Sequence, residues 1–303
     1  MTRFPNGARV CFLGDSITAA NVYTTYIAAA YYEQFPEAGI EFYNSGVSGA
    51  GAYTMHHRFE ADCLSHDTTH ATLMTGVNDA ELWHLEQPHG ANRYMALKRA
   101  ALRYHDNMRL LCERILEKGI SLTLLTPPPY AEYNEAPNEP WQGGAAVLTH
   151  YADYVHALGK EYGLPVVDVQ AHLTLMNEIE PLFNPDRVHP NAKGQFEIAR
   201  CVLASQGIDI GPFRELPVFI REWYETVLKE RTIPWLERNV IPYCIKDDDK
   251  RIAFIRDYLE NKRYPRDVFK DYSERYLEYK PQEEFLKREV IRLAKELAGT
   301  NNR

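Results

Sequence analysis

The chain of 303 residues lacks the features that would point to a nucleic acid or a membrane as its partner. Lysine and arginine number 34 against 42 acidic residues, for a net charge of −8, so the basic face that favours nucleic-acid binding is not expected. No apolar run approaches the length that spans a bilayer. Residues 1–6 also lack the long apolar region of a secretory signal peptide, which favours a cytoplasmic protein.

Cysteine is scarce, and its placement argues against a disulfide framework. The five cysteines are scattered and odd in number, and no two form a C-x-x-C pair, so a zinc knuckle is not indicated. Four histidines fall between residues 56 and 70, but no H-E-x-x-H motif accompanies them, and solvated or hydrogen-bonding side chains are the better interpretation. A P-loop and a complete dinucleotide fingerprint are absent too. The sequence therefore predicts neither a metal ion nor an organic cofactor.

What the chain does contain is an alternation of apolar runs with helical patterns. Hydrophobic residues make up 45% of it, which is enough for a proper core. Runs suited to buried strands recur at residues 8–13, 40–43, 70–75, 120–126 and 165–169. Helical patterns occupy residues 22–35, 54–64, 93–118, 145–162 and 192–206. This alternation predicts βα units around a parallel sheet, in which ligands bind at the carboxyl ends of the strands.

The composition shifts near residue 211, and this marks the expected domain boundary. Residues 213–303 are rich in charge and aromatic side chains, show helical periodicity and contain no strand-like run. Four irregularly spaced prolines in this part argue against a continuous coiled coil. We therefore expect an α/β domain over residues 1–210 and an all-helical extension over residues 211–303. A homo-oligomer built through that extension is one hypothesis.

Polar residues follow the first three predicted strands. Gly14-Asp15-Ser16 comes directly after the first strand, where a turn into a helix can project a serine hydroxyl beside helix N–H groups. An ordinary helix N-cap explains the same residues, because serine and aspartate both cap helices well. The segments Asn44–Gly49 and Gly76–Asp79 follow the next two strands. They offer a glycine N–H and an asparagine amide, which are natural donors to an oxyanion.

A fourth polar block, Asp186-Arg187-Val188-His189-Pro190, stands far downstream. An aspartate and a histidine three residues apart can reach each other around one turn, so that the carboxylate orients the imidazole. That is the relation a general base needs. The serine of the first block and this pair together favour nucleophilic catalysis.

The four blocks, in this order, resemble those of the SGNH hydrolases, also called the GDSL esterase/lipase family. They read GDSIT, NSGVSG, GVND and DRVHP, and the resemblance covers residues 5–208. It implies a flavodoxin-like three-layer α/β/α sandwich, so that residues 1–210 would be an SGNH hydrolase catalytic domain. It also implies a serine esterase that works through a Ser-His-Asp triad and a covalent acyl-enzyme.

Carried over by position, the resemblance assigns a role to five residues. Ser16 would be the nucleophile, His189 the general base and Asp186 the carboxylate that orients the base. The oxyanion hole would consist of the backbone N–H groups of Ser16 and Gly49 and the side-chain amide of Asn78.

The substrate is inferred from the resemblance together with the expected cytoplasmic location, and the lack of a long apolar lid helix disfavours a bulky lipid. A short acyl group, most of all acetyl, on a sugar or oligosaccharide is the expectation, and a thioesterase or lysophospholipase of the same family is the alternative. The long loop 127–144 should emerge at the same edge of the sheet, and Asp15, Tyr130 and Trp141 are predicted to bind substrate. A hypothesis of another class is a non-catalytic binding or scaffolding protein that uses the helical extension.

Overall fold

The computed structural model of the chain describes residues 1–86 and 92–215. Five parallel strands form one sheet in the order β2-β1-β3-β4-β5. Their bounds are β1 Arg9–Gly14, β2 Glu41–Gly46, β3 His70–Met74, β4 Ser121–Leu125 and β5 Val166–Val167. This is the flavodoxin-like order, in which the strand sequence reverses between β1 and β3.

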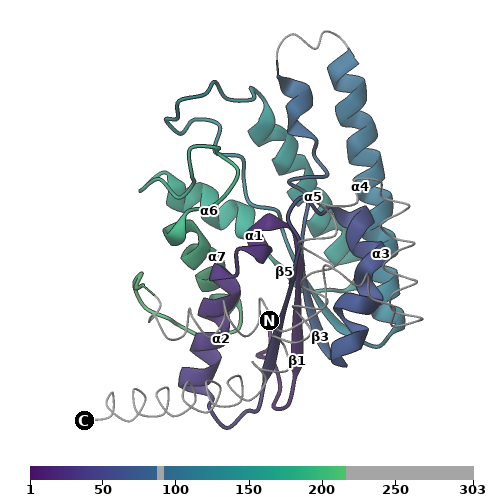
Figure 1. Cartoon of the computed structure of the whole chain (residues 1–303), viewed down its shortest axis with the longest axis vertical. Coiled ribbons are helices and arrows are strands. Elements are labelled where there is room, and N and C mark those ends of the chain that lie inside the picture. Colours follow the sequence, from purple (N-terminus) through teal and green to yellow (C-terminus); the bar gives the residue numbers. More distant parts are fainter. Residues whose placement is uncertain (87–91, 216–303) are drawn as a thin grey trace, which may run out of the picture.

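Helices cover both faces of the sheet (Figure 1). One face carries α2 (Val22–Gln34), α6 (Val169–Asn177) and α7 (Ala192–Ser205), and the other carries α3 (Ala52–Asp62), α4 (Asn92–Glu117) and α5 (Gly144–Tyr162). The short α1 (Ser16–Ala19) and the 3₁₀ turns η1 (Leu64–His66) and η2 (Leu82–Leu85) complete the described elements. The predicted three-layer sandwich is confirmed. None of the helices in these ranges has both the length and the apolar character needed to cross a membrane.

The interior strand β1 needs a helical layer on each side. Val10 and Phe12 belong to the cluster under α2 and α7, whereas Cys11 and Leu13 belong to the cluster under α3, α4 and α5. Each of the four is at most 1% exposed. Successive side chains of a strand point to opposite faces, so an unbroken apolar run can be buried only between two layers.

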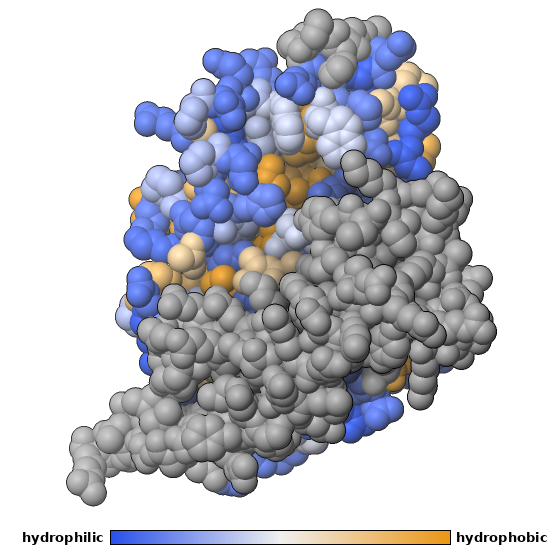
Figure 2. Space-filling model, in the orientation of Figure 1, coloured by the Kyte–Doolittle hydropathy of each residue, from blue (hydrophilic) through white to orange (hydrophobic). Residues whose placement is uncertain are grey.

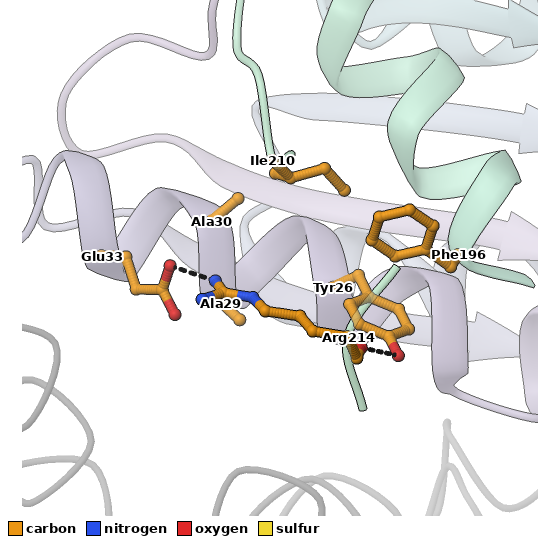
Figure 3. A pocket seen from close by; sticks show the side chains of 7 residues that line it. All are labelled: Tyr26, Ala29, Ala30, Glu33, Phe196, Ile210 and Arg214. Atoms are coloured by element: carbon orange, nitrogen blue, oxygen red, sulfur yellow. Dashed lines mark hydrogen bonds and ion pairs between the residues drawn. The ribbon is translucent and has the colours of Figure 1, made fainter. Parts of the chain in front are cut away.

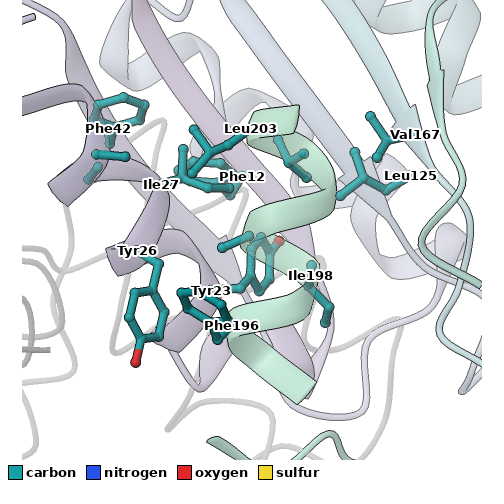
Figure 4. Packing of buried hydrophobic residues seen from close by; sticks show 14 of the residues in the cluster. Phe12, Tyr23, Tyr26, Ile27, Phe42, Leu125, Val167, Phe196, Ile198 and Leu203 are labelled. Carbon is teal, nitrogen blue, oxygen red and sulfur yellow. The ribbon is translucent and has the colours of Figure 1, made fainter. Parts of the chain in front are cut away.

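Aromatic rings fill the core on the α2 and α7 side (Figure 4). The Phe12 ring contacts Tyr23 edge to face and stacks on Phe42, with ring centroids 6.0 and 5.9 Å apart. Tyr26 of α2 meets Phe196 of α7 edge to face at 5.1 Å. These contacts fix α7 against α2 and β1, which matters because α7 follows the predicted histidine block.

The carboxyl ends of the first three strands meet at one edge. The register pairs Gly14 of β1 with Gly46 of β2 and with Met74 of β3. At Gly46 a Cβ atom would lie 2.2 Å from the backbone nitrogen of Ala19, so only glycine lets α1 pass over the end of β2. The three polar blocks after these strands are thereby brought to the same edge.

After α7 the chain turns back across α2 (Figure 3). The Tyr26 hydroxyl donates to the carbonyl oxygen of Arg214 at 2.8 Å, and the Arg214 guanidinium pairs with Glu33 at 2.6 Å. The Phe213 ring packs edge to face on Phe196 at 5.5 Å. The described sandwich thus continues to residue 215. The predicted helical extension lies, beyond that residue, outside the described part of the chain.

The region of the fifth strand differs from the prediction. The strand, expected over residues 165–169, is limited to Val166–Val167. Asp168 ends it, because its Oδ1 accepts the N–H of Ala171 at 2.9 Å and caps α6, a helix that the apolar pattern did not reveal.

Candidate active site

The end of β1 delivers a serine to the carboxyl edge of the sheet. β1 stops at Gly14 and α1 begins at Ser16. Asp15 between them is the N-cap, since its Oδ1 accepts the N–H of Ile17 at 2.9 Å. Ser16 is the first residue of α1, so its N–H has no acceptor within the helix. Asp15 does the capping, and the Ser16 hydroxyl is left for another partner.

That partner is His189, which lies 173 residues further along the chain. The Ser16 Oγ is 2.8 Å from His189 Nε2, and His189 Nδ1 is 2.7 Å from Asp186 Oδ2. The other carboxylate oxygen of Asp186 accepts the backbone N–H groups of Val188 and His189, each at 2.9 Å. The carboxylate therefore fixes both the ring and the backbone of the histidine.

Electrostatics keep Asp186 ionised. Partial burial raises the pKa of its carboxyl, but the backbone N–H groups of His189 and Val188 and the imidazole outweigh this and hold the pKa below its usual range. The His189 side chain is 42% exposed and that of Asp186 is 50% exposed. The pair is thus open to solvent and can exchange protons with molecules bound there.

Gly49 lies in a turn that follows β2. The Ala50 N–H donates to the Val47 carbonyl at 3.1 Å, and Gly49 has a φ of 78°, which glycine adopts without strain. Within residues 1–86 and 92–215, the Gly49 N–H forms no hydrogen bond to another backbone group. The N–H of Gly46, the other glycine of this block, already donates to Asn44 Oδ1 at 2.8 Å. Gly49 is therefore the glycine with a donor to offer.

Asn78 reaches across from the end of β3 to the same turn. Its Nδ2 donates to the carbonyl oxygen of Ala50 at 3.0 Å. A side-chain amide carries two N–H protons, so one remains for a ligand. The bond fixes the Asn78 amide next to the Gly49 turn.

Asp79 holds the loop that carries Asn78 in place. Its Oδ1 accepts the N–H of Ala52, the first residue of α3, and its Oδ2 accepts the Thr75 hydroxyl, both at 2.9 Å. Two tyrosines hold the loop backbone, because Tyr151 donates to the Asp79 carbonyl at 3.0 Å and Tyr104 to the Thr75 carbonyl at 3.2 Å. The loop that carries Asn78 is thus tied to α3, α4 and α5.

Two carboxyls beneath the site have raised pKa values. Burial raises the pKa of Asp15 to about 7, although the Ile17 N–H lowers it, and the nearby Asp79 raises it further. Burial likewise raises the pKa of Asp79 to about 6, against hydrogen bonds from Ala52 and Thr75 that lower it. Asp15 is 2% exposed and caps α1, so its predicted contact with substrate stays a prediction.

Tyr130 and Trp141 lie together at the base of the loop between β4 and α5. Their rings stack with centroids 5.8 Å apart, and the Tyr130 hydroxyl accepts the backbone N–H of Trp141 at 2.9 Å. Tyr130 is 4% exposed, whereas Trp141 is partly exposed. The two side chains support the loop, and a substrate contact for them stays a prediction.

Arg58 of α3 is a residue that the sequence analysis missed. Its guanidinium donates to the carbonyl oxygens of Ser45 at 2.9 Å and Gly14 at 3.1 Å, and it pairs with Asp62. It is 8% exposed. One buried side chain thus joins the ends of β1 and β2 below the site. Its main partners are backbone carbonyls, which no pattern of residue types reveals.

In the described ranges, no group of three or more histidine, cysteine, aspartate or glutamate side chains is arranged to hold a metal ion. Figure 2 shows apolar residues gathered in a hollow between polar ones, near the end of the sheet where Figure 1 labels α1. The functional groups at this edge are a hydroxyl, an imidazole, a carboxylate and N–H donors.

Serine, histidine and aspartate joined by hydrogen bonds at the carboxyl edge of a parallel α/β sheet form an arrangement that serine hydrolases share. The profile of the GDSL-like lipase/acylhydrolase family matches residues 12–195. The chain belongs to this family, so the resemblance on which the sequence analysis relied is confirmed.

Individual relatives have low sequence identity to this chain. The acetylxylan esterase of Geobacillus stearothermophilus is 27% identical over 227 residues, which cover 67% of this chain and 96% of the relative. A crystal structure of an acetylxylan esterase from that organism has a TM-score of 0.55 at 25% identity, over 69% of this chain and 99% of its own. A gut microbial diltiazem-metabolizing enzyme has a TM-score of 0.63 at 24% identity, over 68% of this chain. The chain covers 48% of that enzyme, about half of its length, and this likeness shows the fold alone.

The variant Asp15→Asn should remove a pH dependence of stability. Folding raises the pKa of Asp15 from 3.8 to about 7, so the folded state binds the proton more tightly. The free energy of unfolding of the wild type therefore falls as the pH rises through this window. Asparagine keeps an oxygen for the Ile17 N–H and has no proton to lose. Within this window, the free energy of unfolding of the variant should rise relative to that of the wild type by about 1.4 kcal/mol per pH unit.

Urea unfolding followed by circular dichroism, at pH values on both sides of that window, measures the difference. Asp79→Asn is the matched comparison. The pKa of Asp79 is about 6, so the difference in free energy of unfolding between this variant and the wild type should stop growing at a lower pH. If the free energies of unfolding of the wild type and Asp15→Asn changed with pH in the same way across the window, the raised pKa would be contradicted.

Proposed function

We propose that the protein is a serine esterase that hydrolyses short-chain acyl esters, above all acetyl esters of a carbohydrate, through a covalent acyl-enzyme. The observation that carries this proposal is the unbroken series of hydrogen bonds from Ser16 Oγ to His189 at 2.8 Å and from His189 to Asp186 at 2.7 Å. Ser16 is the nucleophile, His189 the general base, and Asp186 the group that orients it.

In the acylation step, His189 Nε2 takes the proton of Ser16 as Oγ attacks the ester carbonyl carbon. Asp186, ionised because of its lowered pKa, stabilises the imidazolium that forms. The imidazolium then gives its proton to the leaving alcohol oxygen as the C–O bond breaks. Water, activated by the same imidazole, attacks the acyl-serine, and the acid is released as Ser16 regains its proton.

The carbonyl oxygen becomes negatively charged in each tetrahedral intermediate. Its donors are the N–H groups of Ser16 and Gly49 and the second N–H of the Asn78 amide. Their geometry is set before substrate arrives, since Asn78 is bonded to Ala50 and the Gly49 turn is closed by Val47. Preorganised donors of this kind are the largest single contribution in many acyl-transfer enzymes.

The relatives support the choice of substrate. One curated relative is an acetylxylan esterase, and two solved forms of such an esterase are described as catalytic mutants in which a serine or an aspartate is replaced by alanine. A thioesterase or lysophospholipase of the same family is the alternative.

The helical extension over residues 211–303, a homo-oligomer built through it, and a cytoplasmic location stay predictions. A scaffolding role through the extension also stays a hypothesis, because residues 216–303 lie outside the described ranges. It is compatible with esterase activity at the edge of the sheet.

Ser16→Ala should abolish the hydrolysis of p-nitrophenyl acetate, because the covalent step needs the hydroxyl. A serine-directed phosphonate should add once to the wild type, at Ser16, and leave the variant unlabelled in mass spectrometry. Full activity in a folded Ser16→Ala protein, or an adduct on another residue, would remove Ser16 from the mechanism.

Asn78→Ala should lower kcat by about 10²–10³ with the fold intact, because one oxyanion donor is lost. Asn107→Ala is the matched control: Asn107 Nδ2 also donates to a backbone carbonyl, that of Arg103 at 2.8 Å, but on α4. Steady-state kinetics of both variants separate the two effects. Equal kcat values in Asn78→Ala and the wild type would exclude Asn78 from the oxyanion hole.

The acyl group is tested by comparing acetyl, butyryl and octanoyl esters of p-nitrophenol. The expected order of kcat/KM is acetyl, then butyryl, then octanoyl, as a site for short acyl groups requires. A preference for the octanoyl ester would contradict the proposed substrate and favour the lysophospholipase alternative.

A further inference from the structure

Arg187 has a strained backbone inside the turn that carries the histidine. The turn is closed by a bridge between Phe183 and Pro190 and by the Asn184 N–H, which donates to the His189 carbonyl at 2.9 Å. At its tip, the Arg187 N–H donates to the Asn184 carbonyl at 2.9 Å, and φ is 62°. This left-handed conformation suits glycine and is unfavourable for arginine, so other contacts must hold the residue there.

Those contacts reach the loop between β4 and α5. The Arg187 Nε donates to the carbonyl oxygen of Asn134 at 3.1 Å, and Nη1 donates to that of Asn138 at 2.6 Å. In return, the Ala131 N–H donates to the Arg187 carbonyl at 2.9 Å. Arg187 is 6% exposed although it is charged. A buried guanidinium must find acceptors, and the loop supplies them as backbone carbonyls.

The loop is fixed at its other points to elements of the sandwich. Glu132 caps α5, with its carboxylate oxygens accepting the N–H groups of Gly143 at 2.9 Å and Ala145 at 3.0 Å. The side-chain amides of Asn134 and Asn177 bond each other at 2.7 and 3.2 Å. The segment Ala131–Asn138 is therefore bonded to three parts of the fold. These are the start of α5, Asn177 of α6, and the turn that carries Asp186 and His189.

We propose that Arg187 is a positioning residue that makes the His189 turn and the segment Ala131–Asn138 one unit, and that this segment forms the wall beside the leaving alcohol. The proposal rests on the proposed function, in which His189 gives its proton to the alcohol oxygen. The alcohol must then lie close to His189, and Arg187 fastens the segment to the turn that carries His189. The positions of the segment Ala131–Asn138 and of His189 are thus coupled through the guanidinium of Arg187.

Glycine is the informative substitution at this position. Arg187→Gly keeps the left-handed turn, because glycine adopts this conformation without strain, and removes both guanidinium bonds. Arg187→Ala removes the same bonds but keeps the strain. Asp67→Gly is the control for strain relief, since Asp67 is exposed and has a φ of 48° at the end of η1. Arg109→Ala is the control for a lost arginine bond, because Arg109 links α4 to Glu161 of α5.

The experiment combines kinetics with amide hydrogen exchange on the full-length chain. Arg187→Gly and Arg187→Ala should lower kcat for p-nitrophenyl acetate by about 10- to 100-fold, as expected for a displaced base. Exchange should become faster in both segments 131–138 and 184–189 and stay unchanged in β1 and β3. Millimolar guanidinium ion should restore part of the lost kcat of Arg187→Gly, whereas urea at the same concentration should not. Both controls should behave as the wild type does.

Three results would overturn the proposal. An Arg187→Gly protein with wild-type kcat would show that the side chain does not position the base. Faster exchange in 184–189 alone would show that the two segments are not coupled, and an equal effect of urea and guanidinium would remove the guanidinium from the explanation. If the wild type has no esterase activity, the proposed function fails, and the exchange data still test the coupling.

Discussion

The hydrogen bond of 2.8 Å between Ser16 Oγ and His189 Nε2 joins two loops that are 173 residues apart in the chain. A shift of about 1 Å at such a bond can cost about 10²-fold in rate, so both ends must be held by the fold itself. At the serine end, β1 is paired on both sides, and Arg58 bonds the last carbonyl of the strand, that of Gly14. At the histidine end, α7 packs on α2. Gln195 of α7 donates to the carbonyl of Ile17 in α1 at 3.3 Å, which links α7 directly to the helix that begins with Ser16.

The polar groups that hold this edge are costly to bury. A carboxyl or guanidinium without partners would destabilise the fold by several kcal/mol, so each is bonded to backbone or to another side chain. Asp15 and Asp79 each cap a helix at the site, and their raised pKa values reflect the remaining cost of burial. Arg187 and Gly49 have positive φ values in the turns beside the serine. The edge thus combines left-handed backbone with buried carboxyls that have raised pKa values, features that are common at functional sites.

The architecture could be predicted from the sequence because it leaves local signals, and the polar blocks that hold Ser16, Asp186 and His189 stood out in the same way. Apolar runs mark β1 to β4, and the polar blocks follow the strand ends that a parallel sheet brings together. The helix α6 escaped prediction, because Asp168 both ends a strand and caps a helix within one apolar stretch. Arg58, Asp79, Gln195 and Arg187 could not be predicted as supports of the site. Their partners are mainly backbone groups of distant segments, and a φ of 62° at an arginine has no signature in the residue types around it.

In the proposed mechanism, the hydroxyl of Ser16 faces an imidazole on one side and three N–H donors on the other. A crystal structure of the phosphonate adduct tests this most directly, because a tetrahedral phosphorus resembles the intermediate. We expect one phosphoryl oxygen about 2.7–3.1 Å from the backbone nitrogens of Ser16 and Gly49 and from Asn78 Nδ2, with His189 Nε2 on the opposite side. An adduct whose oxygen points to solvent, or away from Asn78 and Gly49, would contradict it.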